Sequence, residues 1–203
     1  AKCFGGEVEG RGAIIGTKND ADIETTFTFK KIKVQQIAEL NDTIKNRFFG
    51  TANGKSEIAF RSGKDSEALK SMKGRIEFTI DNGKLVDTGL QNGLGTVLSE
   101  MKYKLKDLEF SKIAGNLSIL GSNFYVNHFE FFAPDVRLKL EGYFNKELEG
   151  DLKLNLEFNK NFIQDVPNPA LLQLNKYKQG GWYIIPFVMK GSITKGENYK
   201  KLK

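Results

Sequence analysis

The stretch Asp151-Leu-Lys-Leu-Asn-Leu-Glu-Phe158 alternates polar and apolar residues over its whole length. Successive side chains of a β-strand point to opposite faces of a sheet, so the pattern predicts a strand with one apolar and one wetted face. Antiparallel sheets with one face in water have this pattern, whereas parallel sheets buried on both faces need continuous apolar runs. The stretch therefore favours a mainly antiparallel fold.

The same alternation recurs at residues 23–30, 75–80 and 136–141. Asn82-Gly83 and Asn53-Gly54 are typical of tight hairpin turns, and Gly121-Ser122-Asn123 predicts a third turn. Apolar spacing and capping residues predict short helices over residues 34–40, 65–72, 90–101 and 168–174. We therefore expect a mainly β fold with short helices (α+β). Its large antiparallel, strongly curved sheet should form an open groove or half-barrel, with helices covering one face or end.

Glycines recur on the apolar side of the predicted strands. The repeated pattern is apolar-x-Gly-x-apolar, centred on Gly74, Gly115, Gly142, Gly150 and Gly191. Glycine inside a strand permits a bulge or a strong bend. Two interpretations stay open: the glycines only bend the strands, or the bends also roll the sheet into a trough with an apolar lining.

Composition argues against most catalytic chemistries. The 203 residues include one Cys and one His, so an intramolecular disulfide, a cysteine-based zinc site and any site with two imidazoles are excluded. The formal net charge of +6 is mild and does not by itself predict nucleic-acid binding. No spacing pairs two carboxylates. We expect no enzyme activity, no catalytic residues, no metal site, no cofactor and no nucleic-acid partner.

Two motifs come close to functional signatures. Gly50-Thr-Ala-Asn-Gly-Lys-Ser56 has three residues between its first Gly and the Gly-Lys pair, where a phosphate-binding loop needs four. A hairpin turn is the better interpretation. His128 lies on an alternating segment without a second His, so a structural or surface role is predicted. The basic runs 30–33 and 200–203 are either solvated charge or contacts for anionic lipid head groups.

Residues 48–195 also carry an ordered set of motifs. Residues 69–85 precede Thr88-Gly89-Leu90 and a predicted helix, residues 108–119 continue to Phe131-Phe-Ala-Pro134 and to 136–142, and residues 185–192 close the set. This order resembles the C-terminal region of AsmA-like proteins, and residues 185–192 look like the last strand of that family. The Pro often found after the last strand of that family is missing, because Ile193-Thr-Lys follows. The family's long N-terminal part and membrane anchor are also missing from this sequence.

The resemblance implies one AsmA-like domain over residues 1–203, a fragment of a longer protein. It also implies a periplasmic location, an inner-membrane anchor in the full-length protein, and a role in outer-membrane biogenesis within the cell envelope. Repeating β-groove proteins of this kind are linked to phospholipid transport, so the expected partners are an acyl-chain lipid and envelope proteins. The family brings no catalytic residues.

The predicted lipid groove is lined by apolar residues of the alternating segments: Ile76, Phe78, Leu117, Ile119, Leu138, Leu140, Leu152, Leu154 and Leu156. A trough that covers acyl chains removes most of the cost of exposing them to water, about 0.8 kcal/mol per methylene. The alternative is a structural or assembly module of an outer-membrane biogenesis protein, with a closed core and no lipid. The predicted helix 90–101 would distinguish the two, because it could fill the apolar face.

Overall fold

Twelve strands form one antiparallel sheet in the order β1-β2-β3-β4-β5-β6-β7-β8-β9-β11-β10, and β12 also pairs with β11. The computed structural model describes residues 1–17, 20–40, 42, 45–63, 65–86, 107–161, 174–193 and 198–201. The predicted antiparallel, mainly β architecture with a few short helices is confirmed. The strands are β1 (Lys2–Cys3), β2 (Gly6–Thr17), β3 (Asp20–Lys33), β4 (Phe48–Arg61), β5 (Lys73–Leu85), β6 (Leu108–Leu120), β7 (Asn123–Phe132), β8 (Val136–Asn145), β9 (Glu149–Asn159), β10 (Lys178–Gln179), β11 (Trp182–Ser192) and β12 (Tyr199–Lys201).

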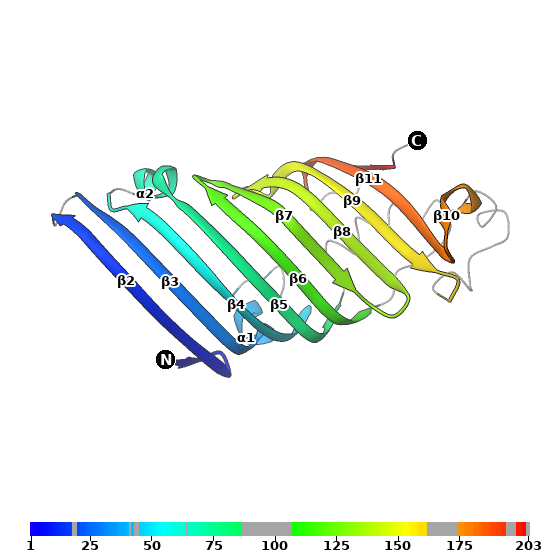
Figure 1. Ribbon diagram of the computed structural model, residues 1–203, viewed down its shortest axis with the longest axis horizontal. Helices are drawn as coiled ribbons and strands as arrows, with labels where there is room; N and C mark the ends of the chain where they lie inside the picture. The colour runs from blue at the N-terminus through cyan, green and yellow to red at the C-terminus, as the bar shows by residue number, and fades with distance from the viewer. Residues whose placement is uncertain are drawn as a thin grey trace.

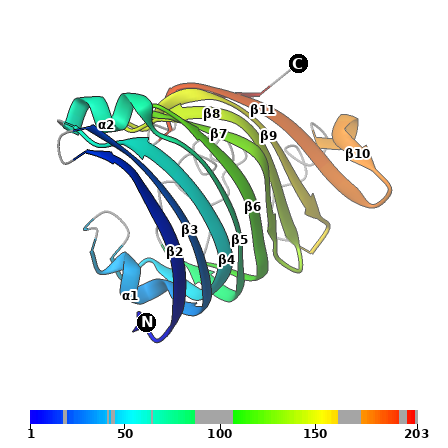
Figure 2. The same ribbon diagram turned by 60° about the vertical axis from the view of Figure 1, so that its left-hand side comes forward.

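The sheet is a meander, in which strands β1 to β9 lie side by side in chain order (Figure 1). The long strands bend along their length, so the whole sheet is curved when seen from the side (Figure 2). Irregular register accompanies this bending, for example between Phe29 and Ile32 of β3 and between Val126 and Phe129 of β7. Bulges of this kind bend a strand and increase its local twist.

The described α-helices lie at the ends of the strands. The predicted helices near residues 34–40 and 65–72 are present as α1 (Val34–Ala38) and α2 (Asp65–Ser71). Figures 1 and 2 place them at opposite ends of the strands, near β4 in both cases, and neither one runs across a face. The predicted helix 90–101 lies outside the described residues. So does the helix 168–174 except for Leu174, which is buried just before the 3-10 turn η1 (Asn175–Tyr177).

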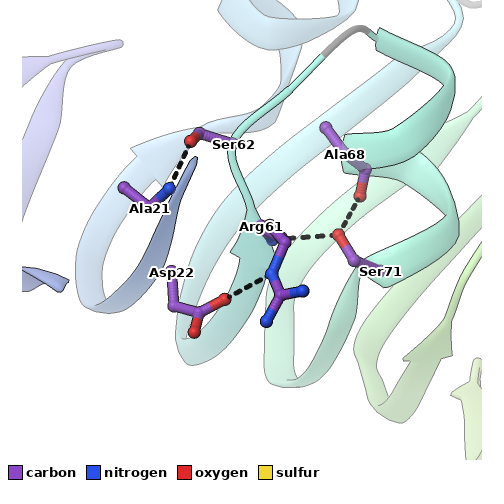
Figure 3. A network of polar contacts seen from close by, with 6 residues as sticks. All are labelled: Ala21, Asp22, Arg61, Ser62, Ala68 and Ser71. Atoms are coloured by element: carbon purple, nitrogen blue, oxygen red, sulfur yellow. Dashed lines mark hydrogen bonds and ion pairs between the residues drawn. The ribbon is translucent and has the colours of Figure 1, made fainter. Parts of the chain in front are cut away.

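A polar network fixes α2 to the ends of β3 and β4 (Figure 3). The backbone N–H of Arg61 donates to Oγ of Ser71 at 2.9 Å, and that hydroxyl donates to the carbonyl of Ala68 at 3.0 Å. One strand away, the N–H of Ala21 donates to Oγ of Ser62 at 2.8 Å. These bonds satisfy backbone groups where the sheet ladder ends, which would otherwise cost free energy.

Two of the three predicted turns are wrong. Asn53-Gly54 lies inside β4 and Asn82-Gly83 lies inside β5, and each of these strands pairs with a neighbouring strand on both of its sides. Asn82 does adopt the left-handed conformation that its sequence suggests, with φ of 49°, but the strand continues beyond it to Leu85. Pairing with the neighbouring strands therefore overrides the local turn preference. The turn at Gly121 is confirmed between β6 and β7.

Most of the glycines inside the strands lie directly against an aromatic ring or against the backbone of a neighbouring strand. A Cβ at Gly115 would lie 2.5 Å from Cζ of Phe78, its partner on β5, and Phe27 covers Gly10 in the same way. Phe29 lies over Gly54, and Phe110 over Gly83. At Gly142 and Gly150 a Cβ would meet the backbone of the paired strand. The glycines thus allow close strand contact and ring packing, and are not empty notches in the lining.

Substitution of Gly115 by valine tests this packing. The added side chain needs the space of the Phe78 ring, so we expect the free energy of unfolding to fall by about 1–3 kcal/mol, measured by urea denaturation. In the double variant with Phe78→Ala, the valine should cost clearly less, because the ring is gone. An equal cost in both backgrounds would contradict the proposed ring-over-glycine contact.

Candidate functional site: the apolar face

One face of the sheet carries apolar side chains on every long strand, and we call it the apolar face. Strand register places Leu156 of β9 between Leu138 of β8 and Ile185 of β11. Leu154 lies in the same way between Leu140 and Phe187. Side chains of directly opposed residues in an antiparallel pair share a face. Each set of opposed residues therefore forms a row of side chains that runs across the strands on one face of the sheet.

All nine residues predicted to line a groove lie on this face. Ile76 is opposite Leu117, Phe78 is opposite Gly115, and Ile119 is opposite Gly74. Leu138, Leu140, Leu152, Leu154 and Leu156 form the adjoining rows on β8 and β9. Their burial differs, however: Ile119 and the leucines other than Leu117 and Leu140 are buried, whereas Ile76, Phe78, Leu117 and Leu140 are half-buried.

The apolar face is closed over the C-terminal strands. Leu138, Leu156 and Ile185 are each 1% exposed, and Met189 is fully buried. Aromatic rings add to this packing, with Phe158 stacked on Tyr183 at 5.6 Å and Phe110 tilted against Phe131 at 5.4 Å. This half of the face is an ordinary hydrophobic core, held by the close packing that protein interiors share.

The apolar face becomes exposed toward the N-terminal strands. Val8, Gly10, Gly12 and Ile14 of β2 pair with Phe29, Phe27, Thr25 and Ile23 of β3 on the same face. Ile14 is 75% exposed and Phe27 is 37% exposed, while Ile58 and Phe60 on β4 are half-buried. The face therefore runs from a buried core into a partly exposed apolar surface at β2–β5.

Ile76 and Phe78 of β5 belong to the predicted lining, but the residues of this exposed part on β2, β3 and β4 were not included in it. The alternation of residues 23–30 already places Ile23, Thr25, Phe27 and Phe29 on one side of a strand. What the sequence lacks is the register that joins this side to the row of Phe78 and Ile76 through Gly54 and Ser56 of β4. Register is set by pairing in three dimensions, and alternation alone does not specify which rows meet.

The opposite face is polar and carries cross-strand ion pairs. Nζ of Lys55 lies 3.3 Å from Glu77, whose second oxygen lies 2.9 Å from Arg75. Lys139 approaches Glu157 at 3.4 Å, and the guanidinium of Arg137 lies over the Trp182 ring at 4.1 Å. Shallow hollows of about 570–590 Å³ lie among such residues, for example around Ala114. They carry mixed charge and small side chains.

Groups that could perform chemistry are dispersed. His128 lies on the polar face, with Nε2 3.4 Å from Glu130. Asp107 accepts a hydrogen bond from the amine of Lys84 and so raises the pKa of that amine above its ordinary value. Within the described ranges, no three His, Cys, Asp or Glu side chains cluster as metal ligands would. Helices long and apolar enough to span a bilayer are likewise missing from the part of the chain that the structure describes.

Comparison with family models, curated proteins and solved structures gives no match for this chain. The apolar face is therefore interpreted from its own residues, together with the resemblance noted above.

Proposed function

We propose that this chain is a non-enzymatic lipid-handling domain. Its apolar face would line the inside of the curved sheet and hold or conduct phospholipid acyl chains between inner and outer membranes. The observation that carries the proposal is the continuous apolar face, which is partly exposed at β2–β5 with Phe27 at 37% and Ile14 at 75%. Exposed apolar patches on a soluble domain mark binding sites.

The dimensions of the face suit an acyl chain. The partly exposed part of the face covers the four neighbouring strands β2 to β5. With strands about 4.8 Å apart, this part extends about 14 Å across them. The hydrocarbon core of a bilayer, which two lipids fill tail to tail, is about 30 Å thick, so one acyl chain is about 15 Å long. A single acyl chain placed across these strands would thus match the exposed part of the face, and its head group would remain in water.

The periplasmic location, the inner-membrane anchor and the envelope partners belong to the same proposal. They come from the AsmA-like resemblance of residues 48–195, and the apolar face is compatible with them. In this proposal the domain supplies a passive path, because hydrophobic burial of the chains needs no cofactor.

Mass spectrometry of lipids bound to the purified chain tests the proposal. The chain is incubated with phospholipid vesicles, separated from them by size exclusion, and extracted. We expect phospholipid at about one molecule per chain or a substantial fraction of it. Recovery at the level of an unrelated soluble protein would contradict the lipid-handling function.

The closed C-terminal half supports a second candidate. Leu138, Leu156 and Met189 are already buried without any lipid, as expected for a structural or assembly module with a filled core. That alternative predicts no bound lipid in the same experiment, and a melting temperature that phospholipid does not raise.

A further inference from the structure

Strand β2 leaves an open edge on the sheet. On one side β2 pairs with β3 in unbroken register from Glu7–Lys30 to Thr17–Asp20. On the other side the two residues of β1 pair only with Gly6 and Glu7, and Ala1 extends that pairing to Val8. Among the described residues, Glu9–Thr17 therefore has no strand on its outer side. The opposite edge is different, because β10 pairs with Trp182–Tyr183 of β11 and β12 pairs with Phe187–Met189.

The hydrogen-bonding groups on this edge can be assigned. Both backbone groups of Val8 bond to Ala1, with the N–H donating to the Ala1 carbonyl at 2.8 Å and the Ala1 amine donating to the Val8 carbonyl at 2.6 Å. In an antiparallel ladder, successive residues direct these groups to alternate sides. Since the β2–β3 register is unbroken, the outward groups beyond Val8 belong to Gly10, Gly12, Ile14 and Gly16.

Three of these four residues are glycines, so no side chain obstructs an approaching backbone. Glu9 and Arg11 place charge on the polar face of this edge, but other protective devices are missing from it. It contains no proline and no inward-pointing charge, and it exposes Ile14 at 75% and Ile15 at 63%, one on each face. Long, exposed edges of this kind pair with further strands. By contrast, the uncovered middle of β11, between β10 and β12, contains Pro186.

We propose that Glu9–Thr17 binds an extended polypeptide strand that runs antiparallel to β2, in line with β1. The direction follows from the existing pairing, because Ala1–Val8, Lys2–Glu7 and Cys3–Gly6 define one register that continues along β2. The bound strand alternates apolar and polar residues. Its residues opposite Gly10, Gly12, Ile14 and Gly16 are apolar or Thr and extend the apolar face, while the residues between them are polar. Binding of this strand to β2 does not require lipid binding by the apolar face.

The experiment supplies such a strand next to Ala1. A nine-residue copy of Asp20–Thr28 is joined directly before Ala1 in the full chain. By the register of β1, the copied Thr28, Phe27, Thr25 and Ile23 come opposite Glu9, Gly10, Gly12 and Ile14, as the original residues do in β3. The matched control carries proline in place of the copied Thr25 and Ile23, whose N–H groups would face β2.

Amide hydrogen exchange is the measurement. In the unmodified chain the amides of Gly10, Gly12, Ile14 and Gly16 should exchange fast, while those of Arg11 and Ala13, bonded to β3, are protected. The extension should slow the four outward amides by at least about tenfold, and the proline control should not. In the extended chain, Gly12→Pro should remove the protection of Gly10 and Ile14, since its ring replaces only an outward N–H.

Two results would overturn the proposal. One is an extended chain in which the four outward amides exchange as fast as in the proline control. The other is an unmodified chain in which they are already protected in a concentration-dependent way, which would assign the edge to a second copy of this chain.

Discussion

Replacing Phe158 by alanine is expected to lower the free energy of unfolding by about 3–5 kcal/mol, the range for a large aromatic side chain lost from a core. Phe158 has no exposed surface and stacks on Tyr183 at 5.6 Å. It also lies opposite Val136 of β8, which is 3% exposed. The cavity that alanine leaves is enclosed on several sides, so relaxation of the neighbours can recover little of the lost contact.

Urea denaturation followed by circular dichroism measures this loss. Phe27→Ala is the matched control, because it makes the same truncation on the same face where the ring is 37% exposed. Its expected cost is about 1 kcal/mol or less. Equal costs for the two variants would mean that the apolar face is not divided into a closed C-terminal half and an open N-terminal half.

Lipid binding is expected to depend on the exposed part of the apolar face. Phe27→Glu should reduce the phospholipid recovered after vesicle incubation by about tenfold or more, because a carboxylate buried against acyl chains without a partner costs several kcal/mol. Phe27 lies over Gly10 on the exposed part of the apolar face. A charge there changes the binding surface, and the fold loses little because the position already contacts water.

Thr28→Glu is the control for this substitution. Thr28 is the next residue on β3, but its side chain points to the polar face, opposite Lys55. The same charge on the same strand should leave lipid recovery unchanged. An equal loss of phospholipid recovery in the two variants would mean that the charge disturbs the folding of β3. Unchanged recovery in both variants would contradict acyl-chain binding by the apolar face.

Alternation in the sequence was sufficient to predict the antiparallel sheet and the shared face of the nine residues that were predicted to line a groove. The pattern underestimated the length of the strands, because a bulge interrupts the alternation without ending the strand. Asn127 and His128 of β7 are both exposed, for example, between Val126 and Phe129 of the apolar face. Lys31, with φ of 56°, interrupts β3 in the same way. An Asn-Gly pair suits such a bulge as well as a hairpin turn, so local preference could not distinguish them.

Burial along the apolar face could not be predicted from the same pattern. Leu154 and Ile76 occupy equivalent places in their alternating segments, yet Leu154 is 2% exposed and Ile76 is half-buried. The difference comes from how many neighbours pack over each row, which depends on register and curvature. The ring-over-glycine pairs escaped prediction for the same reason, since Phe78 and Gly115 meet only through the pairing of β5 with β6.

The meander order of the sheet has a consequence for folding. From β2 to β8 each strand pairs with the strands that precede and follow it in the chain, as the units of a repeat protein do. In such quasi-one-dimensional arrays stability is nearly a sum over adjacent units, and structure propagates from the strongest of them. The buried β8–β9–β11 rows are the natural nucleus here. The molecule should therefore fold outward from its C-terminal strands, and among the long strands it should fray first at β2, because Glu9–Thr17 pairs with β3 alone among the described residues.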